Sequence, residues 1–152
     1  MVIGINSTKD AIFIAETSGA GEAFDVKKIT RLQFELSGAS DLVDLLKTLK
    51  TLLANLRDQE CETAAILCCS SGQYGSSIEA VKAEAVVQLA AHECGFTVAA
   101  VKPQSLKSAL DCEKGEQWQA KSKELLNADG IHKYWSQGAN GAAAAAYKAA
   151  KN

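Results

Sequence analysis

The sequence predicts an α/β fold in which a mixed five-stranded sheet, three antiparallel strands followed by two parallel ones, carries helices on both faces. Three observations support it. The chain opens on two short apolar runs separated by a polar turn, which is typical of a β-hairpin. A leucine-rich stretch at helical spacing then precedes a short, continuously apolar run, as a helix does when it leads into a buried parallel strand. A second helix and strand follow in the same order.

The opening hairpin organises the rest of the chain. Residues 2–6 are apolar nearly throughout and predict a buried strand, residues 7–10 are polar and predict a turn, and residues 11–15 predict the second strand. Gly4 lies inside the first strand, where a glycine usually marks a close approach by backbone or ligand. The first strand ends on a polar residue, Asn6, at a tight turn.

A third strand and a long helix complete the first half. Residues 28–36 alternate between apolar and polar side chains, which predicts a half-exposed antiparallel strand. Ser40 is the expected N-cap of the helix, with Asp41 and Asp44 in its first turn, where acidic side chains complement the helix dipole. Leucines at helical spacing make one face apolar to about Arg57, which predicts core packing.

The parallel half of the sheet begins with residues 63–69, a continuous apolar run. Residues 70–77 form a loop rich in glycine and serine. Ser76 and Glu79 stand three apart, as in a capping box, and predict the start of a helix that ends at Gly95. The loop precedes a helix N-terminus and could hold an anion, although it lacks the lysine pattern of a P-loop, and an ordinary loop is the alternative.

The last third of the chain contains one more strand and several helices. Residues 96–101 are apolar and predict the fifth strand. Pro103 opens a short helix at its first position, and residues 118–126 are a candidate for the next helix. Asn140 is the expected cap of a final helix over residues 142–150, which is almost pure alanine and is therefore suited to close packing on a sheet.

Composition narrows the function classes. The chain has 152 residues, 47% of them hydrophobic, and a formal net charge of -2, so we expect one domain over residues 1–152 with no global attraction to nucleic acid. No apolar run is long enough to span a membrane, and no secretory signal is visible, so we expect a cytoplasmic protein. The five cysteines form no CxxC pair and no zinc spacing, which predicts reduced thiols.

Several stretches resemble the RuvC-type Holliday-junction resolvases, and the order of the elements is that of the ribonuclease H-like fold. Residues 3–6 resemble the first strand of those resolvases, residues 101–107 the segment after their fifth strand, and residues 139–144 their alanine-rich last helix. Residues 72–77, with the helix behind them, are similar to a small bacterial family of RuvC-like proteins of unknown function.

The resemblance implies a two-magnesium nuclease, whose carboxylates come from the end of the first strand, the fourth strand and the start of the last helix. This sequence departs from that pattern at all three places. The first position is Asn6, and the second falls at Leu67 or Cys68. The last-helix positions fall near Gly138, Asn140 and Gly141. We therefore predict no catalytic residues, no bound metal and no cofactor.

Residues that could bind a partner surround the same segments. The candidate binding residues are Asn6, Tyr74, Ser76, Ser77, Lys82, Glu84, Lys102 and Lys107. Glu84 and Lys82 lie two residues apart and form either a surface ion pair or part of a site that lines the glycine loop. Glu79 is better explained as a cap partner.

Lysines are frequent in the last third of the chain, with two tryptophans between them. The set is Lys102, Lys107, Lys114, Lys121, Lys123, Trp118 and Trp135. Such a patch can contact phosphates, and exposed aromatic rings can stack on bases. Interleaved glutamates dilute the charge, so a solvated surface is the alternative.

The sequence thus predicts a catalytically degenerate RuvC-like protein, a pseudo-nuclease that binds DNA, RNA or a protein partner. One alternative is a metal-dependent, structure-selective nuclease with a rearranged active site, which requires carboxylates to converge near Asn6. Another is a nucleotide-binding module, for which the chain is short. Homodimerisation through an exposed third strand is also compatible with the pattern.

Overall fold

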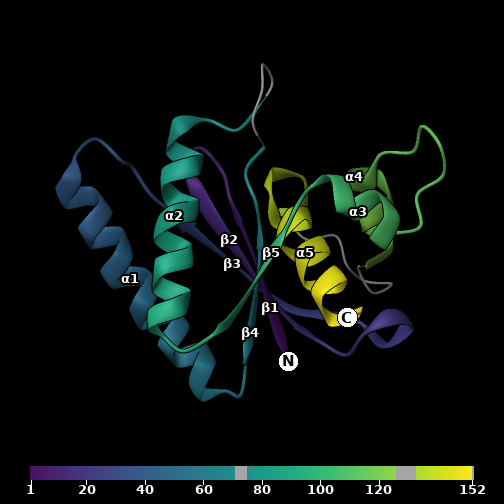
Figure 1. The fold of residues 1–152 in the computed structure, drawn as a ribbon, viewed down its shortest axis with the longest axis horizontal. Helices are drawn as coiled ribbons and strands as arrows, with labels where there is room; N and C mark the ends of the chain where they lie inside the picture. Colours follow the sequence, from purple (N-terminus) through teal and green to yellow (C-terminus); the bar gives the residue numbers. More distant parts are fainter. Residues whose placement is uncertain (71–74, 126–132, 152) are drawn as a thin grey trace.

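The computed structural model describes residues 1–70, 75–125 and 133–151, and its centre is a twisted mixed sheet of five strands (Figure 1). The order across the sheet is β3-β2-β1-β4-β5. The strands are β1 (Val2–Ser7), β2 (Ala11–Ser18), β3 (Asp25–Gln33), β4 (Thr63–Leu67) and β5 (Thr97–Val101). The first three pair antiparallel, and β4 and β5 run parallel to β1, which confirms the predicted sheet.

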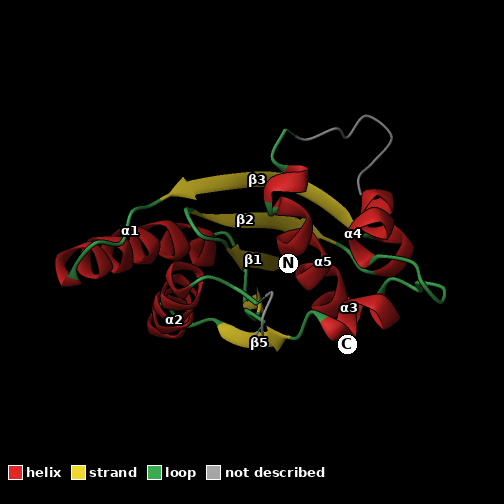
Figure 2. Ribbon diagram, turned by 90° about the horizontal axis from the view of Figure 1, so that it is seen from above, coloured by secondary structure: helices red, strands yellow, loops and turns green. Residues whose placement is uncertain are grey.

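Helices cover both faces of the sheet, as predicted (Figure 2). One face carries α1 (Ala39–Asp58) and α2 (Ile78–Glu93), and the other carries α5 (Ala139–Lys151) with the short α3 (Gln104–Ala109) and α4 (Trp118–Lys121). Short 3-10 turns lie at Gly21–Ala23, Ser122–Leu125 and Trp135–Gln137. No helix in the described ranges is both long and apolar enough to cross a membrane.

The two faces have different cores. Under α1 and α2, large side chains such as Ile3, Ile5 and Leu49 are fully buried. Under α5, the buried helix residues are nearly all alanine, and they pack directly on β1, β2 and β4. A Cβ atom added at Gly4 would overlap the carbonyl oxygen of Ala142, so this glycine allows the backbones of β1 and α5 to touch.

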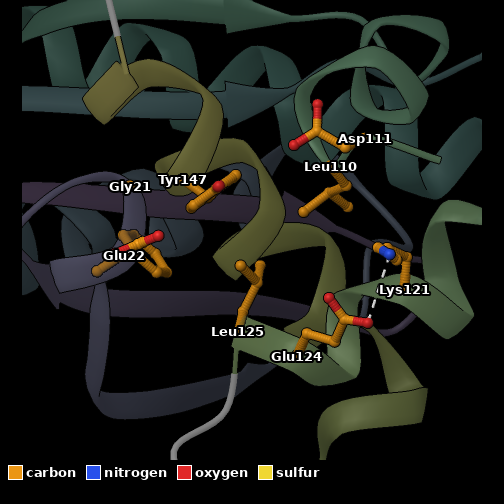
Figure 3. A pocket seen from close by; sticks show the side chains of 9 residues that line it. Gly21, Glu22, Leu110, Asp111, Lys121, Glu124, Leu125 and Tyr147 are labelled. Carbon is orange, nitrogen blue, oxygen red and sulfur yellow. Dashed lines mark ion pairs between the residues drawn. The ribbon is translucent and has the colours of Figure 1, made fainter.

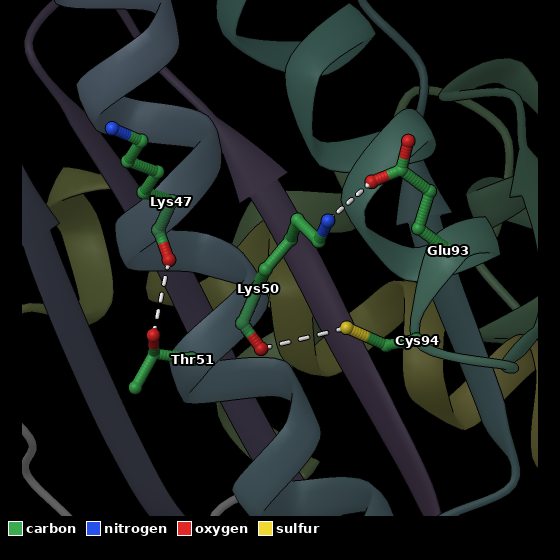
Figure 4. A network of polar contacts seen from close by, with 5 residues as sticks. All are labelled: Lys47, Lys50, Thr51, Glu93 and Cys94. Carbon is green, nitrogen blue, oxygen red and sulfur yellow. Dashed lines mark hydrogen bonds and ion pairs between the residues drawn. The ribbon is translucent and has the colours of Figure 1, made fainter.

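Polar contacts join Lys50 of α1 to the C-terminal end of α2 (Figure 4). Lys50 Nζ lies 2.9 Å from Glu93 Oε2, and Cys94 Sγ donates to the Lys50 carbonyl oxygen at 3.4 Å. The hydrogen bond and charge of Glu93 raise the pKa of the Lys50 ammonium group, which therefore stays protonated. These contacts are exposed and fix position more than they add stability.

Helix starts differ from the predicted ones by one to three residues. The N-cap of α1 is Gly38, so Ser40 lies inside the helix. Asp41 Oδ2 accepts hydrogen bonds from the Ser37 backbone at 2.8 Å, the Ser37 hydroxyl at 2.8 Å and the Gly38 backbone at 3.1 Å. These bonds, those from Ser37 first, lower the pKa of the Asp41 carboxyl group.

The starts of two other helices also differ from the predicted ones. Ser77 caps α2, because its Oγ accepts from the Ala80 backbone N–H at 3.1 Å, whereas we expected Ser76 in that role. The last helix begins at Ala139, so Asn140 is its second residue and not its cap. Gly95, with φ of 86°, follows the end of α2 as predicted.

Strand ends also differ from the predicted ones, by one or two residues in β1, β4 and β5 and by three residues in β2 and β3. β2 continues to Ser18, beyond the predicted end at residue 15, and a register shift follows Glu16. β3 covers Asp25–Gln33 instead of residues 28–36. Phe34 and Leu36, which completed the alternating pattern, pack in the core beneath α1 without belonging to the strand.

The close contact between β1 and α5 gives a direct prediction. We expect Gly4→Ala to lower the free energy of unfolding by about 3 kcal/mol, because the added methyl group must push α5 away from the sheet. Gly38→Ala is the control, since nothing lies within 4 Å of its added Cβ, and we expect a loss below about 1 kcal/mol. Urea denaturation measures both values, and equal losses in the two variants would contradict the packing described.

Candidate functional site

A row of paired residues crosses all five strands at the level of Asn6. In order from β3 to β5 they are Arg31, Phe13, Asn6, Leu67 and Val101. Directly paired residues point to the same face of a sheet, and Phe13, Leu67 and Val101 lie in the clusters covered by α5. The row therefore faces the start of α5, near the ends of β1, β4 and β5.

The side chain of Asn6 is bound by the segment that leads into α5. Its Nδ2 donates to the Gly138 carbonyl oxygen at 2.9 Å. Gly138 has φ of 148°, and a Cβ there would lie 2.7 Å from ring carbons of Phe13. The backbone bond thus depends on a glycine that can adopt this conformation against an aromatic ring.

Gly141 brings the first turn of α5 onto the same row. A Cβ added to it would lie 2.6 Å from Asn6 Nδ2 and 2.8 Å from Leu67 Cδ2. The backbone of the first turn of α5 therefore lies against one side of the Asn6 amide, and Asn6 is partly buried.

This set of atoms does not fit the two-magnesium centre that the resemblance implies. Magnesium prefers carboxylate oxygens. The residues at these positions are Asn6, whose amide is already bonded to a carbonyl oxygen, Leu67 of the row, and Gly141 of α5. Within residues 1–70, 75–125 and 133–151, no group of three or more histidine, cysteine, aspartate or glutamate side chains could hold a metal ion.

Glu84 reaches from α2 to the end of β4. Its Oε1 accepts a short hydrogen bond from the Cys69 backbone N–H, and its Oε2 accepts from Gln88 Nε2 at 2.9 Å. The ion pairs formed by described residues do not include one between Glu84 and Lys82. Glu84 does contact the residue directly before the glycine loop, so its part in a site that lines this loop stays a prediction. Glu84 thus holds the backbone at Cys69, just after the end of β4, against α2.

The neighbouring thiols are poor nucleophiles. Burial raises the pKa of Cys68, and the negative charge of Glu84 raises it further. Burial is also the largest cause of the raised pKa of Cys69. The thiolate is the reactive form, so both residues remain protonated and unreactive near neutral pH.

Ser76 and Ser77 of the glycine loop have structural partners. Ser76 Oγ accepts from the Ser70 backbone N–H at 3.1 Å, and Ser77 caps α2. Tyr74 lies outside the described residues. Lys82 borders a hollow between α2 and the residues that lead into α1, on the face of the sheet away from α5.

The predicted basic patch is divided. Lys102 is exposed and directly follows Val101, the β5 residue that pairs with Leu67 of β4, so it lies beside the ends of these two strands. Lys107 is exposed on α3. Lys121 is bound to carboxylates, 3.4 Å from Glu124 and 4.0 Å from Glu116.

Neither tryptophan is an exposed stacking platform. Trp135 is 6% exposed and packs under α5, and Trp118 is half-buried against the same helix layer. Trp135 is therefore not available to stack on bases, whereas Trp118 keeps part of its surface exposed.

A hollow of about 320 Å³ lies beside the C-terminal part of α5, away from the row (Figure 3). Its wall includes the carboxylates of Glu22, Asp111 and Glu124, and Lys121 in it is already paired with Glu124. A wall of this charge disfavours the phosphates of nucleic acid.

Sequence reasoning missed Arg31. The alternating pattern placed it on a half-exposed strand, but its position in the row depends on the pairing of β3 with β2. A register shift near Glu16 makes that pairing unreadable from the spacing alone.

The arrangement of the chain can now be compared with known proteins. No protein-family model matches the sequence, and no curated protein sequence matches it. The structure of Thermus thermophilus RuvC is similar at a TM-score of 0.70 and 16% identity, with 97% of this chain and 91% of that one covered. RuvC of the same organism in complex with a Holliday junction substrate gives 0.73 and 17%, covering 97% and 90%. The chain therefore has a RuvC-like fold.

The bond from Asn6 to Gly138 predicts the effect of restoring an aspartate. We expect Asn6→Asp to lower the free energy of unfolding by about 1–3 kcal/mol at neutral pH, because a carboxylate oxygen would then face the Gly138 carbonyl oxygen. The pKa of the new carboxyl group should be raised in the folded state, so the deficit should shrink at acid pH and grow as pH rises through that pKa.

Denaturation at several pH values measures this deficit. Asn55→Asp, an equal change of charge at an exposed position of α1, is the control. An Asn6→Asp protein as stable as the parent at neutral pH would contradict the described contact.

Proposed function

We propose that this protein binds nucleic acid through a RuvC-like fold whose two-metal chemistry has been lost. The observation that carries the proposal is the Asn6 amide held on the Gly138 carbonyl beneath Gly141. A RuvC-type nuclease needs carboxylates at these positions, and here they are an amide and two glycines. The similar RuvC structure that holds a Holliday junction supports DNA or RNA as the partner.

The competing nuclease proposal requires other carboxylates near Asn6. Glu84 lies at the end of β4, and its two oxygens are bonded to the Cys69 backbone and to Gln88. The observations therefore favour binding without cleavage. The five free cysteines support a reducing compartment, such as the cytoplasm.

A protein partner is the second candidate, favoured by the outer face of α2. Ile78, Val81 and Leu89 are 72%, 50% and 47% exposed and lie on one stripe with Ala85. An antiparallel pair of α2 helices centred on Ala85 would place Val81 against Leu89 of the partner subunit, with Lys82 near the neutral Gln88 of the partner subunit. A second copy of the chain therefore suits this face, and light scattering would reveal a dimer.

Binding and cleavage can be tested together. Labelled four-way junction, duplex and single-stranded DNA, and single-stranded RNA, are incubated with the pure protein and magnesium or manganese. We expect a gel shift without cleavage. We expect Lys102→Gln to weaken binding and to reduce the slope of log affinity against log salt by about 1, because it removes one phosphate contact.

Lys47→Gln is the matched control, since Lys47 is exposed on α1, on the opposite face. Cleavage that disappears in Asn6→Ala would overturn the proposal in favour of an active nuclease. If the protein gives neither a gel shift nor cleavage, nucleic-acid binding is rejected and the α2 face remains as the candidate.

A further inference from the structure

We propose that Arg31, Lys133 and the ring of Tyr134 form a binding site for a backbone phosphate of nucleic acid at the β3 end of the row. This inference rests on the proposed function and names where the partner is held. The three residues come from two segments about a hundred positions apart, β3 and the turn before α5.

The ring of Tyr134 positions both cations. Lys133 Nζ lies 4.8 Å and Arg31 Cζ lies 5.8 Å from its centroid. The Phe13 ring, which is 1% exposed, lies 6.2 Å from the same ring and anchors it on the core. Cation–π contacts of this kind hold a charge in place while leaving its donors available.

Among the described residues, no carboxylate forms an ion pair with either cation, and this includes Asp10 in the nearby turn. Arg31 Nη1 makes one long hydrogen bond of 3.4 Å to the neutral Gln33 Oε1. Its Nε is buried and has no acceptor within the described part of the chain. The buried Nε is out of reach of an external phosphate, but Arg31 as a whole is only partly buried. An anion would therefore meet the outer part of the guanidinium group, in which Nη1 makes only the long bond to Gln33.

Phosphate suits this geometry. A guanidinium group offers two parallel donors that match the oxygens of a phosphate, and an ammonium group adds a point charge beside it. Nothing in this arrangement reads a base, so we expect affinity without sequence preference.

The position in the row indicates a polymer and not an isolated anion. Two strand spacings, about 10 Å, separate Arg31 from Asn6 across the sheet. Lys102 follows the β5 member of the row, about 19 Å from Arg31. A nucleic-acid backbone that crosses the start of α5 would meet positive charge at both ends of the row, with the neutral Asn6 between them.

The test measures binding by fluorescence anisotropy with labelled single-stranded and four-way junction DNA over a range of salt concentrations. We expect Arg31→Gln and Lys133→Gln each to weaken binding about tenfold and to lower the salt slope by about 1. Arg31→Lys should keep most of the salt slope but lose part of the affinity, because it retains the charge without the fork of donors.

Lys28→Gln is the matched control. It removes the same charge from β3 at a position that points to the opposite face, one residue before Ile29, which packs beneath α5. Lys133 is exposed, so Lys133→Gln carries the test even if Arg31→Gln lowers stability.

Two failures are distinguishable. If the parent binds DNA and both variants behave like Lys28→Gln, the phosphate site is wrong and the proposed function stands. If the parent binds neither single-stranded nor four-way junction DNA, the proposed function fails and this inference fails with it.

Discussion

The rest of the structure depends on the close approach of α5 to β1. Gly4 removes the side chain on the strand, and the alanines of α5 remove nearly all of them on the helix, so the two backbones touch. Interiors are close-packed, and a contact of this kind tolerates no added methyl group without movement of the helix. The position of α5 then sets the position of everything that its first turn covers, including Asn6, Phe13 and Leu67.

The close contact between α5 and β1 also limits the chemistry that this end of the sheet can perform. In a two-metal nuclease, carboxylates must surround a space large enough for two ions and a phosphodiester. Here Gly141 allows the helix backbone to lie against Asn6 and Leu67. The Gly138 carbonyl oxygen accepts a hydrogen bond from Asn6 Nδ2. What remains at this end of the sheet is positive charge at its flanks, from Arg31, Lys133 and Lys102. Charge without metal ligands is suited to holding a polyanion in place.

Local patterns in the sequence were enough to predict the fold, because the hairpin turn, the apolar run of β4 and the glycine after α2 each act over a few residues. They also singled out Asn6 as a candidate binding residue, and the strand pairing places it in the middle of the row. Features that depend on register were not predictable. Arg31 joins the row only through the pairing of β3 with β2, and the burial of Trp135 depends on how α5 docks. The neighbouring serines before α2 carry nearly the same signal, so geometry alone decides that Ser77 is the cap.

The start of α5 lies against the positions at which a RuvC-type nuclease would need metal-binding carboxylates. Titration with manganese, followed by paramagnetic broadening of backbone amide NMR signals, tests most directly whether metal binds there, because the broadening reports each bound ion by its distance. We expect no selective broadening at Asn6, Cys68 or Gly141, with only uniform weak effects at exposed carboxylates. Selective loss of those three signals at low manganese concentration would show a metal site at the row and contradict the account.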